Sequence, residues 1–272
     1  MDIKIYGAIG YTILNNSDLF KDIEILLISD MHETLTNTCN SVYEISIDKY
    51  ISNLLNKNYT IILEEVPNSK ELVELFPNSN HIKNLRKFYL QNIDKISGID
   101  IRLDLMDITN IKNNNSILIK KILNIYDVYL LKSKLFTHFL LYNEQIDHSI
   151  LKEYYLKLIK KFHKFIYYCG NDLYKYPKYI SVIKIEIIIT LLEEILSDIM
   201  ELYTIMTIYD KINDIIKYNK PKKIVINCGL YHIEQLEQYL IKYLKFKIKK
   251  TEGVVKMEYS YLSNICINYI DF

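Results

Sequence analysis

The sequence predicts an α/β fold: a mainly parallel central sheet flanked by helices, with a long all-helical insertion between the third and fourth core strands. Short apolar segments such as 23–29, 59–63 and 223–228 lack polar alternation, which is typical of strands buried on both faces of a sheet. Segments with helical spacing separate the first three strands, and a β-α-β-α-β order favours parallel pairing through right-handed crossovers. Residues 113–218 show only helical spacing.

Each element before the insertion has its own signal. Residues 3–14 are apolar with glycine breaks, which is typical of a hairpin or an edge strand. Ile47, Ile51 and Leu54 lie at helical spacing, and Pro67 cannot continue a central strand. The predicted elements in chain order are a hairpin or edge strand at 3–14, a strand at 23–29, a helix at 41–56, a strand at 59–63, helices at 70–76 and 81–96, and a strand at 99–103.

Strand signals return only after the helical insertion. Beyond Pro221 a strand is expected at 223–228, and Ile233, Leu236 and Leu240 then lie on one face of a helix. The other elements predicted in this half are helices at 116–142, 149–168 and 179–218 and late strands at 246–249 and 265–270. We therefore predict one α/β core domain built from 1–112 and 219–272, with the helical insertion 113–218 packed on the same domain.

Net charge, cysteine content and the N-terminal sequence indicate which class of partner and which cellular compartment to expect. The 34 Lys and Arg against 33 Asp and Glu give a net charge of +1, which offers no support for nucleic acid or an anionic membrane as partner. Four cysteines without a CxxC pair fit a reducing compartment better than a disulfide scaffold. No signal peptide or transmembrane segment is evident, so we expect a cytoplasmic protein, or a virion location if the chain is viral.

Titratable side chains follow the apolar segments at the point where each predicted strand ends. If the sheet is parallel, these ends lie at one edge, where open α/β folds place their ligands. The residues are Asp30, His32 and Glu33 after the first strand, Glu64 and Glu65 after the second, Asp104 and Asp107 after the third, and Gly229 with His232 after the fourth.

These residue types support two chemistries. Two imidazoles and several carboxylates suit a divalent metal such as Mn²⁺, Co²⁺ or Zn²⁺, with His32, Glu65, His232 and Asp30 as ligands. They also suit metal-free hydrolysis, in which a histidine activates water and a carboxylate orients it. Taken singly, each acid is more often a helix cap or a solvated strand end. His32, however, lies in an Asp-x-His-Glu turn and His232 in a Gly-x-x-His turn, and neither turn is needed merely to end a strand.

Two further residues have a structural and a functional interpretation. Cys228 lies four residues before His232, so a nucleophile pair is conceivable, although such a cysteine is more often a small buried hydrophobe. Arg102 lies within the predicted third strand, where it needs a carboxylate such as Glu64, Glu65 or Asp100, or binds an anionic substrate group. The other four histidines are interpreted as surface or structural residues.

The motifs resemble those of the erythromycin-esterase-like superfamily, which includes the TIKI/TraB proteins and the ChaN-like haem-binding lipoproteins. The resemblance rests on Asp30-Met31-His32-Glu33, on Glu64-Glu65 and on Gly229-Leu230-Tyr231-His232, and it covers 23–107 and 222–245. The chain differs at Ser29 and Asp30, where glycine and glutamate are usual. The resemblance implies a core site of His32, Glu64 or Glu65, and His232, with Asp30 as the first-turn acid.

The leading functional hypothesis is a hydrolase of an ester or amide bond in a small molecule or peptide, with a His/Glu site and with or without a divalent metal. One alternative is a non-catalytic binding or structural protein, such as one from a large DNA virus, that forms a homo-oligomer through the helical insertion. Another is a haem or cofactor binder. Fold-level resemblance does not choose among these activities.

Overall fold

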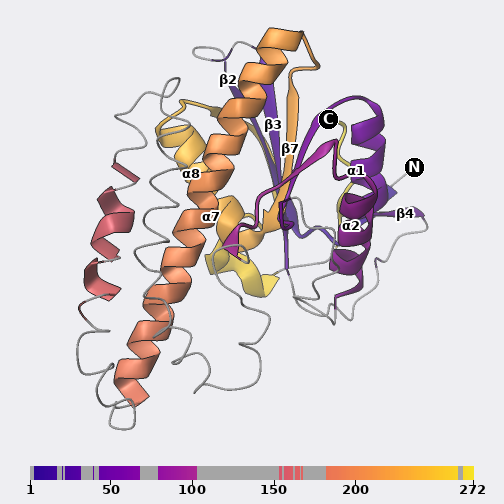
Figure 1. Ribbon diagram of the computed structural model, residues 1–272. Coiled ribbons are helices and arrows are strands. Elements are labelled where there is room, and N and C mark those ends of the chain that lie inside the picture. Colours follow the sequence, from indigo (N-terminus) through magenta and orange to yellow (C-terminus); the bar gives the residue numbers. More distant parts are fainter. Residues whose placement is uncertain are drawn as a thin grey trace. The chain divides into compact units, whose positions relative to one another are not determined.

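The structure is a computed structural model, and the chain in it forms two compact units, one of residues 1–100 with 207–272 and the other of residues 101–206 (Figure 1). The residues that it describes are 3–16, 20, 22–31, 39, 43–67, 79–102, 153–154, 156–161, 163–165, 167, 182–262 and 266–272. Among them, no helix is long and apolar enough to cross a membrane.

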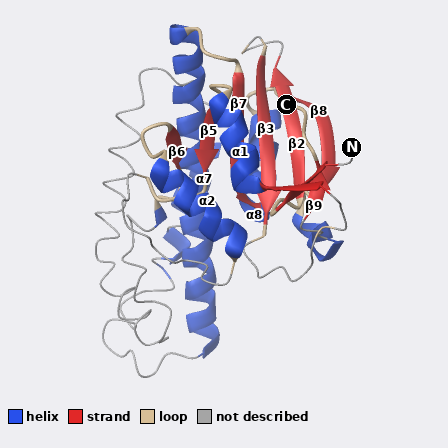
Figure 2. Ribbon diagram, turned by 90° about the vertical axis from the view of Figure 1, so that its right-hand side faces the viewer, coloured by secondary structure: helices blue, strands red, loops and turns tan. Residues whose placement is uncertain are grey.

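A six-stranded sheet forms the centre of the first unit (Figure 2). Its order is β6 (Ile96–Gly98), β5 (Thr60–Leu63), β7 (Lys223–Gly229), β3 (Ile23–Asp30), β2 (Gly10–Asn16) and β8 (Lys247–Gly253). The first four strands run parallel, and β2 runs antiparallel to both β3 and β8. The predicted mainly parallel sheet is therefore confirmed, with an antiparallel edge.

Helices cover both faces of this sheet, which explains why its central strands are apolar throughout. Leu26, Ile28 and Ile61 belong to a buried cluster that also contains side chains of α1 (Ile47–Asn56) and α2 (Asn80–Gln91). On the other face α8 (Leu230–Lys242) contacts β3 and β7. Figure 1 shows α1 and α2 on one side of the strands and α8 on the other. A strand buried on both faces has no solvent-exposed row, so polar alternation is lost.

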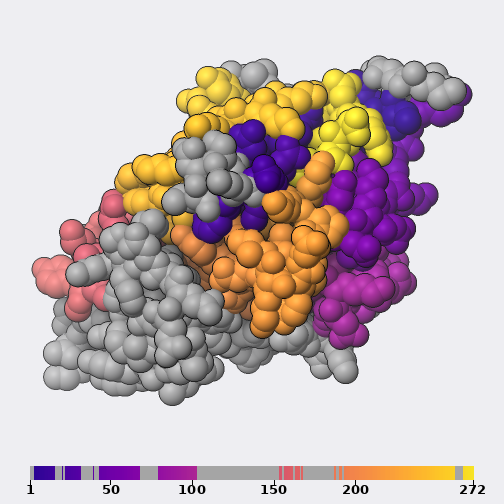
Figure 3. All heavy atoms as spheres, turned by 90° about the horizontal axis from the view of Figure 1, so that it is seen from above, coloured from indigo at the N-terminus to yellow at the C-terminus, as the bar shows by residue number. Residues whose placement is uncertain are grey.

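A small second sheet joins the two ends of the chain. Its order is β4 (Tyr43–Ser46), β1 (Ile3–Tyr6) and β9 (Cys266–Asn268), with β4 parallel and β9 antiparallel to β1. In the space-filling view, indigo residues from the N-terminus lie beside orange and yellow residues from the C-terminal part (Figure 3). The N-terminal and C-terminal segments are thus packed into one unit.

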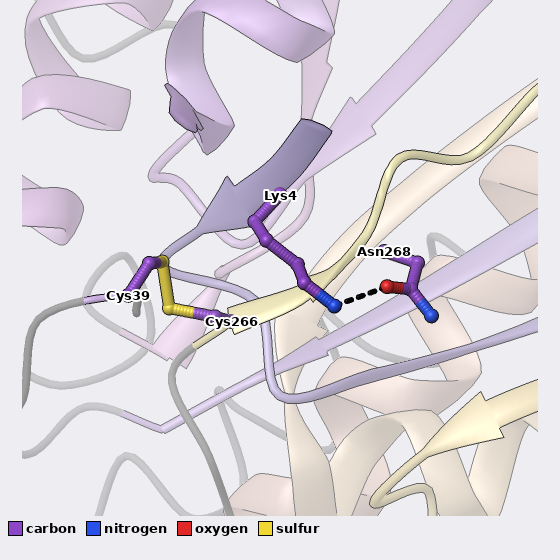
Figure 4. The surroundings of a disulfide bond; sticks show 4 residues. All are labelled: Lys4, Cys39, Cys266 and Asn268. Atoms are coloured by element: carbon purple, nitrogen blue, oxygen red, sulfur yellow. Dashed lines mark hydrogen bonds between the residues drawn. A yellow bond between two sulfur atoms is a disulfide. The ribbon is translucent and has the colours of Figure 1, made fainter. Parts of the chain in front are cut away.

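Cys39 and Cys266 form a disulfide beside this small sheet, next to the hydrogen bond from Lys4 to Asn268 (Figure 4). The two Cα atoms lie 5.7 Å apart, a separation that suits a disulfide. The prediction that the cysteines are reduced is wrong for this pair. Sequence spacing did not reveal it, because 227 positions separate the two residues and only the pairing of β1 with β9 brings Cys266 to this place.

Two predicted elements at the start of the chain are corrected. Residues 3–14 form neither one strand nor a hairpin, because Gly7 adopts a φ of +97° and the chain leaves the small sheet before it enters the large one as β2. The predicted helix 41–56 begins only at Ile47, because residues 43–46 pair with β1 as β4. The predicted helix 70–76 lies outside the described residues.

The third core strand is shifted from its predicted place at 99–103. The strand is β6, which ends at Gly98 opposite Leu63, and Arg102 follows it in a helical turn and is half-buried. A Cβ atom at residue 98 would lie 2.6 Å from the carbonyl oxygen of Glu65 and 2.7 Å from the hydroxyl of Tyr89. The close approach of the chain after β5 therefore requires glycine inside this strand.

The second unit is helical at almost all of its described residues. Residues 153–154, 156–161, 163–165 and 167 are helical, and α7 (Val182–Tyr218) begins in this unit and ends in the first. Lys161 pairs with Asp198 at 2.7 Å, and Tyr154 donates a hydrogen bond to Glu201. The predicted helix 116–142 lies outside the described residues, so the all-helical insertion as a whole stays a prediction.

We expect Gly98→Ala to lower the free energy of unfolding by about 1–3 kcal/mol, because the added methyl group meets the Glu65 carbonyl and the Tyr89 hydroxyl. Denaturant unfolding followed by circular dichroism measures the change. Ser97→Ala on the same strand is the matched control and should stay within about 0.5 kcal/mol. Equal stability of wild type and Gly98→Ala would contradict the close approach of these segments.

Candidate functional site

The carboxyl ends of β5 and β7 form a topological switch point. β5 leads through α2 to β6 at one edge of the sheet, whereas β7 leads through α8 to β8 at the opposite edge. The two strands are neighbours, with Leu63 opposite Asn227. Connections that leave adjacent parallel strands in opposite directions open a crevice above the strand ends, and open α/β proteins bind ligands there.

Glu64, Gly229 and His232 meet at this switch point. The backbone N–H of Gly229 donates a hydrogen bond to Oε2 of Glu64 at 2.7 Å. The other oxygen of the same carboxylate, Oε1, lies 3.8 Å from Nε2 of His232. The Glu64 and His232 side chains are 6% and 7% exposed. A carboxylate and an imidazole thus face each other in a nearly dry environment, with one carboxylate oxygen fixed by the backbone.

Strand alternation explains why Glu64 faces His232. Leu63 belongs to the core cluster on the α1 and α2 side, so the next side chain points to the other face, where α8 lies. His232 is in the first turn of α8, directly above the end of β7. Gly229 is the N-cap of this helix with a φ of −55°, which any residue can adopt. No sharp turn requires glycine here, and the backbone N–H of Gly229 supplies the contact with Glu64.

Glu65 points the other way and pairs with Arg86 of α2, whose Nε donates to Oε2 at 2.8 Å. Burial, assisted by the nearby Glu64 and Asp100 carboxylates, raises the pKa of Glu65 to about 7 against the opposing effect of Arg86. The sequence analysis left Glu64 and Glu65 as equivalent candidates. The structure separates them, with Glu64 beside His232 and Glu65 beside Arg86.

Arg86 was missed by the sequence analysis, which named Arg102 as the arginine that needs a carboxylate. A signal for Arg86 exists in the sequence. Ile82, Leu85 and Tyr89 of α2 are buried, and Arg86 occupies the same helix face at 7% exposure. A cation on an apolar helix face requires an acidic partner.

Ser29 and Asp30 end the strand next to β7. The Ser29 hydroxyl lies within hydrogen-bonding distance of the carbonyl oxygens of Gly10 (3.1 Å) and Val254 (2.8 Å). The hydroxyl thereby connects β3 to the start of β2 and to the segment after β8, so Ser29 has a structural role. Asp30 lies opposite Gly229 in the β3–β7 register and is 2% exposed. Alternation from Leu26 and Ile28 places its side chain on the α1 and α2 side.

His32, Glu33, Asp104 and Asp107 lie outside the described residues. Among the residues that the structure does describe, no group of three or more His, Cys, Asp or Glu side chains is arranged to hold a metal ion. Glu65, one of the four predicted ligands, is already paired with a buried arginine. The metal site predicted from His32, Glu65, His232 and Asp30 stays a prediction, since His32 lies outside the described residues.

Cys228 and the described histidines have structural surroundings. Cys228 is fully buried within β7, which favours the interpretation as a small hydrophobe. His81, on α2, is 3% exposed, with Nδ1 2.9 Å from the Ser79 hydroxyl. His163 is exposed on a helix of the second unit. His232 differs from these two in facing a buried carboxylate, Glu64, at 3.8 Å.

Comparison with protein-family models, with curated proteins and with solved structures finds no match for this chain. The resemblance to the erythromycin-esterase-like superfamily accordingly stays a prediction that rests on the motifs alone.

We expect the stability of the protein to fall as the pH rises from about 4.5 to about 7, through ionisation of Glu65. Its folded pKa lies above its unfolded value, so the folded state binds this proton more tightly and loses that advantage over this interval. The loss should be about 2 kcal/mol in the free energy of unfolding. Glu65→Gln removes this contribution, although it also leaves Arg86 without a charged partner.

Denaturant unfolding at several pH values gives the free energy of unfolding as a function of pH. The slopes of these curves are compared between wild type and Glu65→Gln, because the variant is less stable at every pH. Parallel curves for wild type and Glu65→Gln would show that Glu65 ionises alike in the folded and unfolded chain.

Proposed function

We propose that the protein hydrolyses an ester or amide bond of a small molecule or peptide, with His232 as general base and Glu64 as the carboxylate that orients it. The observation that supports this best is the buried Glu64–His232 pair at the topological switch point. A perturbed or paired titratable group in such a crevice is a candidate for catalysis, since dry surroundings strengthen its electrostatic interactions.

Each contact of the pair has a role in this mechanism. Glu64 accepts the Gly229 N–H with Oε2, which fixes the carboxylate and leaves Oε1 facing Nε2 of His232. A carboxylate beside Nε2 keeps the proton on this nitrogen, so the lone pair is on Nδ1, which takes a proton from the attacking water. The 3.8 Å separation is too long for a hydrogen bond, and catalytic contacts of this kind often shorten when substrate binds.

The start of α8 adds a second catalytic element. The first N–H groups of an α-helix have no partner within the helix, and the helix dipole places partial positive charge there. Because His232 lies in the first turn, these amides are near the atom that its water attacks. They are suited to stabilise the oxyanion that develops on the substrate carbonyl. Glu65 stays with Arg86 in this mechanism and takes no proton-transfer role.

A non-catalytic role for Glu64 is favoured by one observation. The Gly229 N–H is at the N-cap of α8, so the 2.7 Å hydrogen bond also satisfies a helix end and places a negative charge at the positive end of the dipole. In a binding or structural protein this would be its whole function. Activity, not stability, distinguishes the two roles.

We expect His232→Ala to lower kcat for a hydrolysed ester by about 10²-fold or more, since general base catalysis contributes about 10²–10⁴-fold. Glu64→Gln keeps an oxygen for the Gly229 N–H but loses the charge beside Nε2, so kcat should fall while the fold is retained. Stopped assays on p-nitrophenyl esters and on a peptide library measure turnover, and thermal unfolding checks the fold.

The matched control is His163→Ala, which removes an exposed histidine from the second unit and should leave kcat unchanged. Turnover that survives His232→Ala would refute the proposed base. Glu64→Gln with reduced stability, in a wild type that hydrolyses nothing, would instead support the helix-cap role.

A further inference from the structure

An exposed apolar surface lies beside His232 and is not used by the Glu64–His232 pair. It consists of Tyr231 on α8 with Met257 and Tyr259 on the short 3-10 helix η4 (Met257–Leu262), and these side chains are 40%, 45% and 47% exposed. We call it the Tyr231 surface. The N–H of Met257 donates to Oε2 of Glu234 at 3.0 Å. Because Glu234 lies three residues after Tyr231, both are on one side of α8, and η4 packs next to them.

Tyr231 lies at the end of α8 that is nearest to the proposed reaction centre. It is the second residue of α8, and side chains on a helix lean towards the helix N-terminus. The N-terminus of α8 is at the carboxyl edge of the sheet, where Glu64 lies. The Tyr231 ring is 5.4 Å from the His232 ring and nearly perpendicular to it, at 84°. An aromatic surface thus borders the base.

The segments that carry the Tyr231 surface pack on a small buried cluster. Leu230, Ile9 and Val254 form a buried cluster against which Met31 packs. The N–H of Val254 donates to the carbonyl oxygen of Ile9 at 2.8 Å. These contacts anchor the start of α8 and the segment that leads into η4 on the same sheet edge. The exposed side chains are therefore held in place by a packed layer, as a binding site requires.

We propose that Tyr231, Met257 and Tyr259 bind the apolar acyl chain of an ester substrate, an inference that rests on the proposed hydrolase function. Apolar side chains grouped beside a few polar groups are typical of small-molecule sites, and tyrosine and methionine adapt well to an acyl chain. The Glu64 carboxylate lies beside His232 and the Glu234 carboxylate lies beside η4, so a neutral chain is favoured over an anionic one.

The test compares p-nitrophenyl acetate, butyrate and octanoate. In wild type we expect kcat/KM to rise about tenfold or more from acetate to octanoate, because each added methylene is buried against apolar side chains. In the double variant Tyr231→Ala/Met257→Ala the octanoate-to-acetate ratio should fall about tenfold. The matched control is Tyr218→Ala, which removes a 58% exposed tyrosine at the end of α7 and should leave the ratio unchanged. A wild type without chain-length preference would overturn the proposal.

A binding measurement separates this proposal from the hydrolase proposal. The neutral apolar dye N-phenyl-1-naphthylamine is titrated into wild type, His232→Ala and the double variant, and its fluorescence is followed. Binding by the first two and at least fivefold weaker binding by the double variant supports the Tyr231 surface, even if no ester is cleaved. Equal binding by all three proteins, or none by wild type, overturns it even if His232-dependent hydrolysis is found.

Discussion

The position of β7 between β3 and β5 is the constraint on which the candidate site depends. β7 comes from the far end of the chain, yet it pairs in parallel with both strands and places Gly229 opposite Asp30 and Asn227 opposite Leu63. This register brings the ends of three strands to one level. A shift of β7 by one residue would turn every side chain to the other face and would move the start of α8 away from Glu64. The central sheet thus sets the geometry of the Glu64–His232 pair.

Burial of charge at this edge costs free energy that only hydrogen bonds and ion pairs offset. Glu65 and Arg86 are each less than a tenth exposed, and removal of either partner would leave an uncompensated buried charge. Glu64 accepts a backbone N–H and faces an imidazole. A carboxylate kept in such surroundings interacts strongly with any charge that develops nearby, because the local dielectric is low. This is the physical property that acid/base catalysis needs.

The central strands could be predicted from the sequence, because strands buried on both faces of a sheet appear as short apolar segments. The strands β3, β5 and β7 were predicted near their observed bounds, and so was the placement of Glu64 and His232 at their carboxyl ends. The shift of the third strand to β6 could not be predicted, since it depends on Gly98 approaching the chain after β5. The Cys39–Cys266 disulfide depends on pairing across almost the whole chain. Such long-range contacts leave no local pattern.

The two adjacent glutamates, Glu64 and Glu65, have different chemical surroundings because side chains alternate between the two faces of a sheet. Neither residue type nor spacing distinguishes Glu64 from Glu65, but strand alternation continues past Leu63 and sends them to opposite faces of the sheet. On the α2 face an arginine neutralises Glu65, and on the α8 face a histidine and a helix N-terminus meet Glu64. The arginine carries a fixed charge, whereas imidazole exchanges a proton near neutral pH. The α8 face therefore pairs a carboxylate with an imidazole, and the proposed hydrolysis rests on this pair.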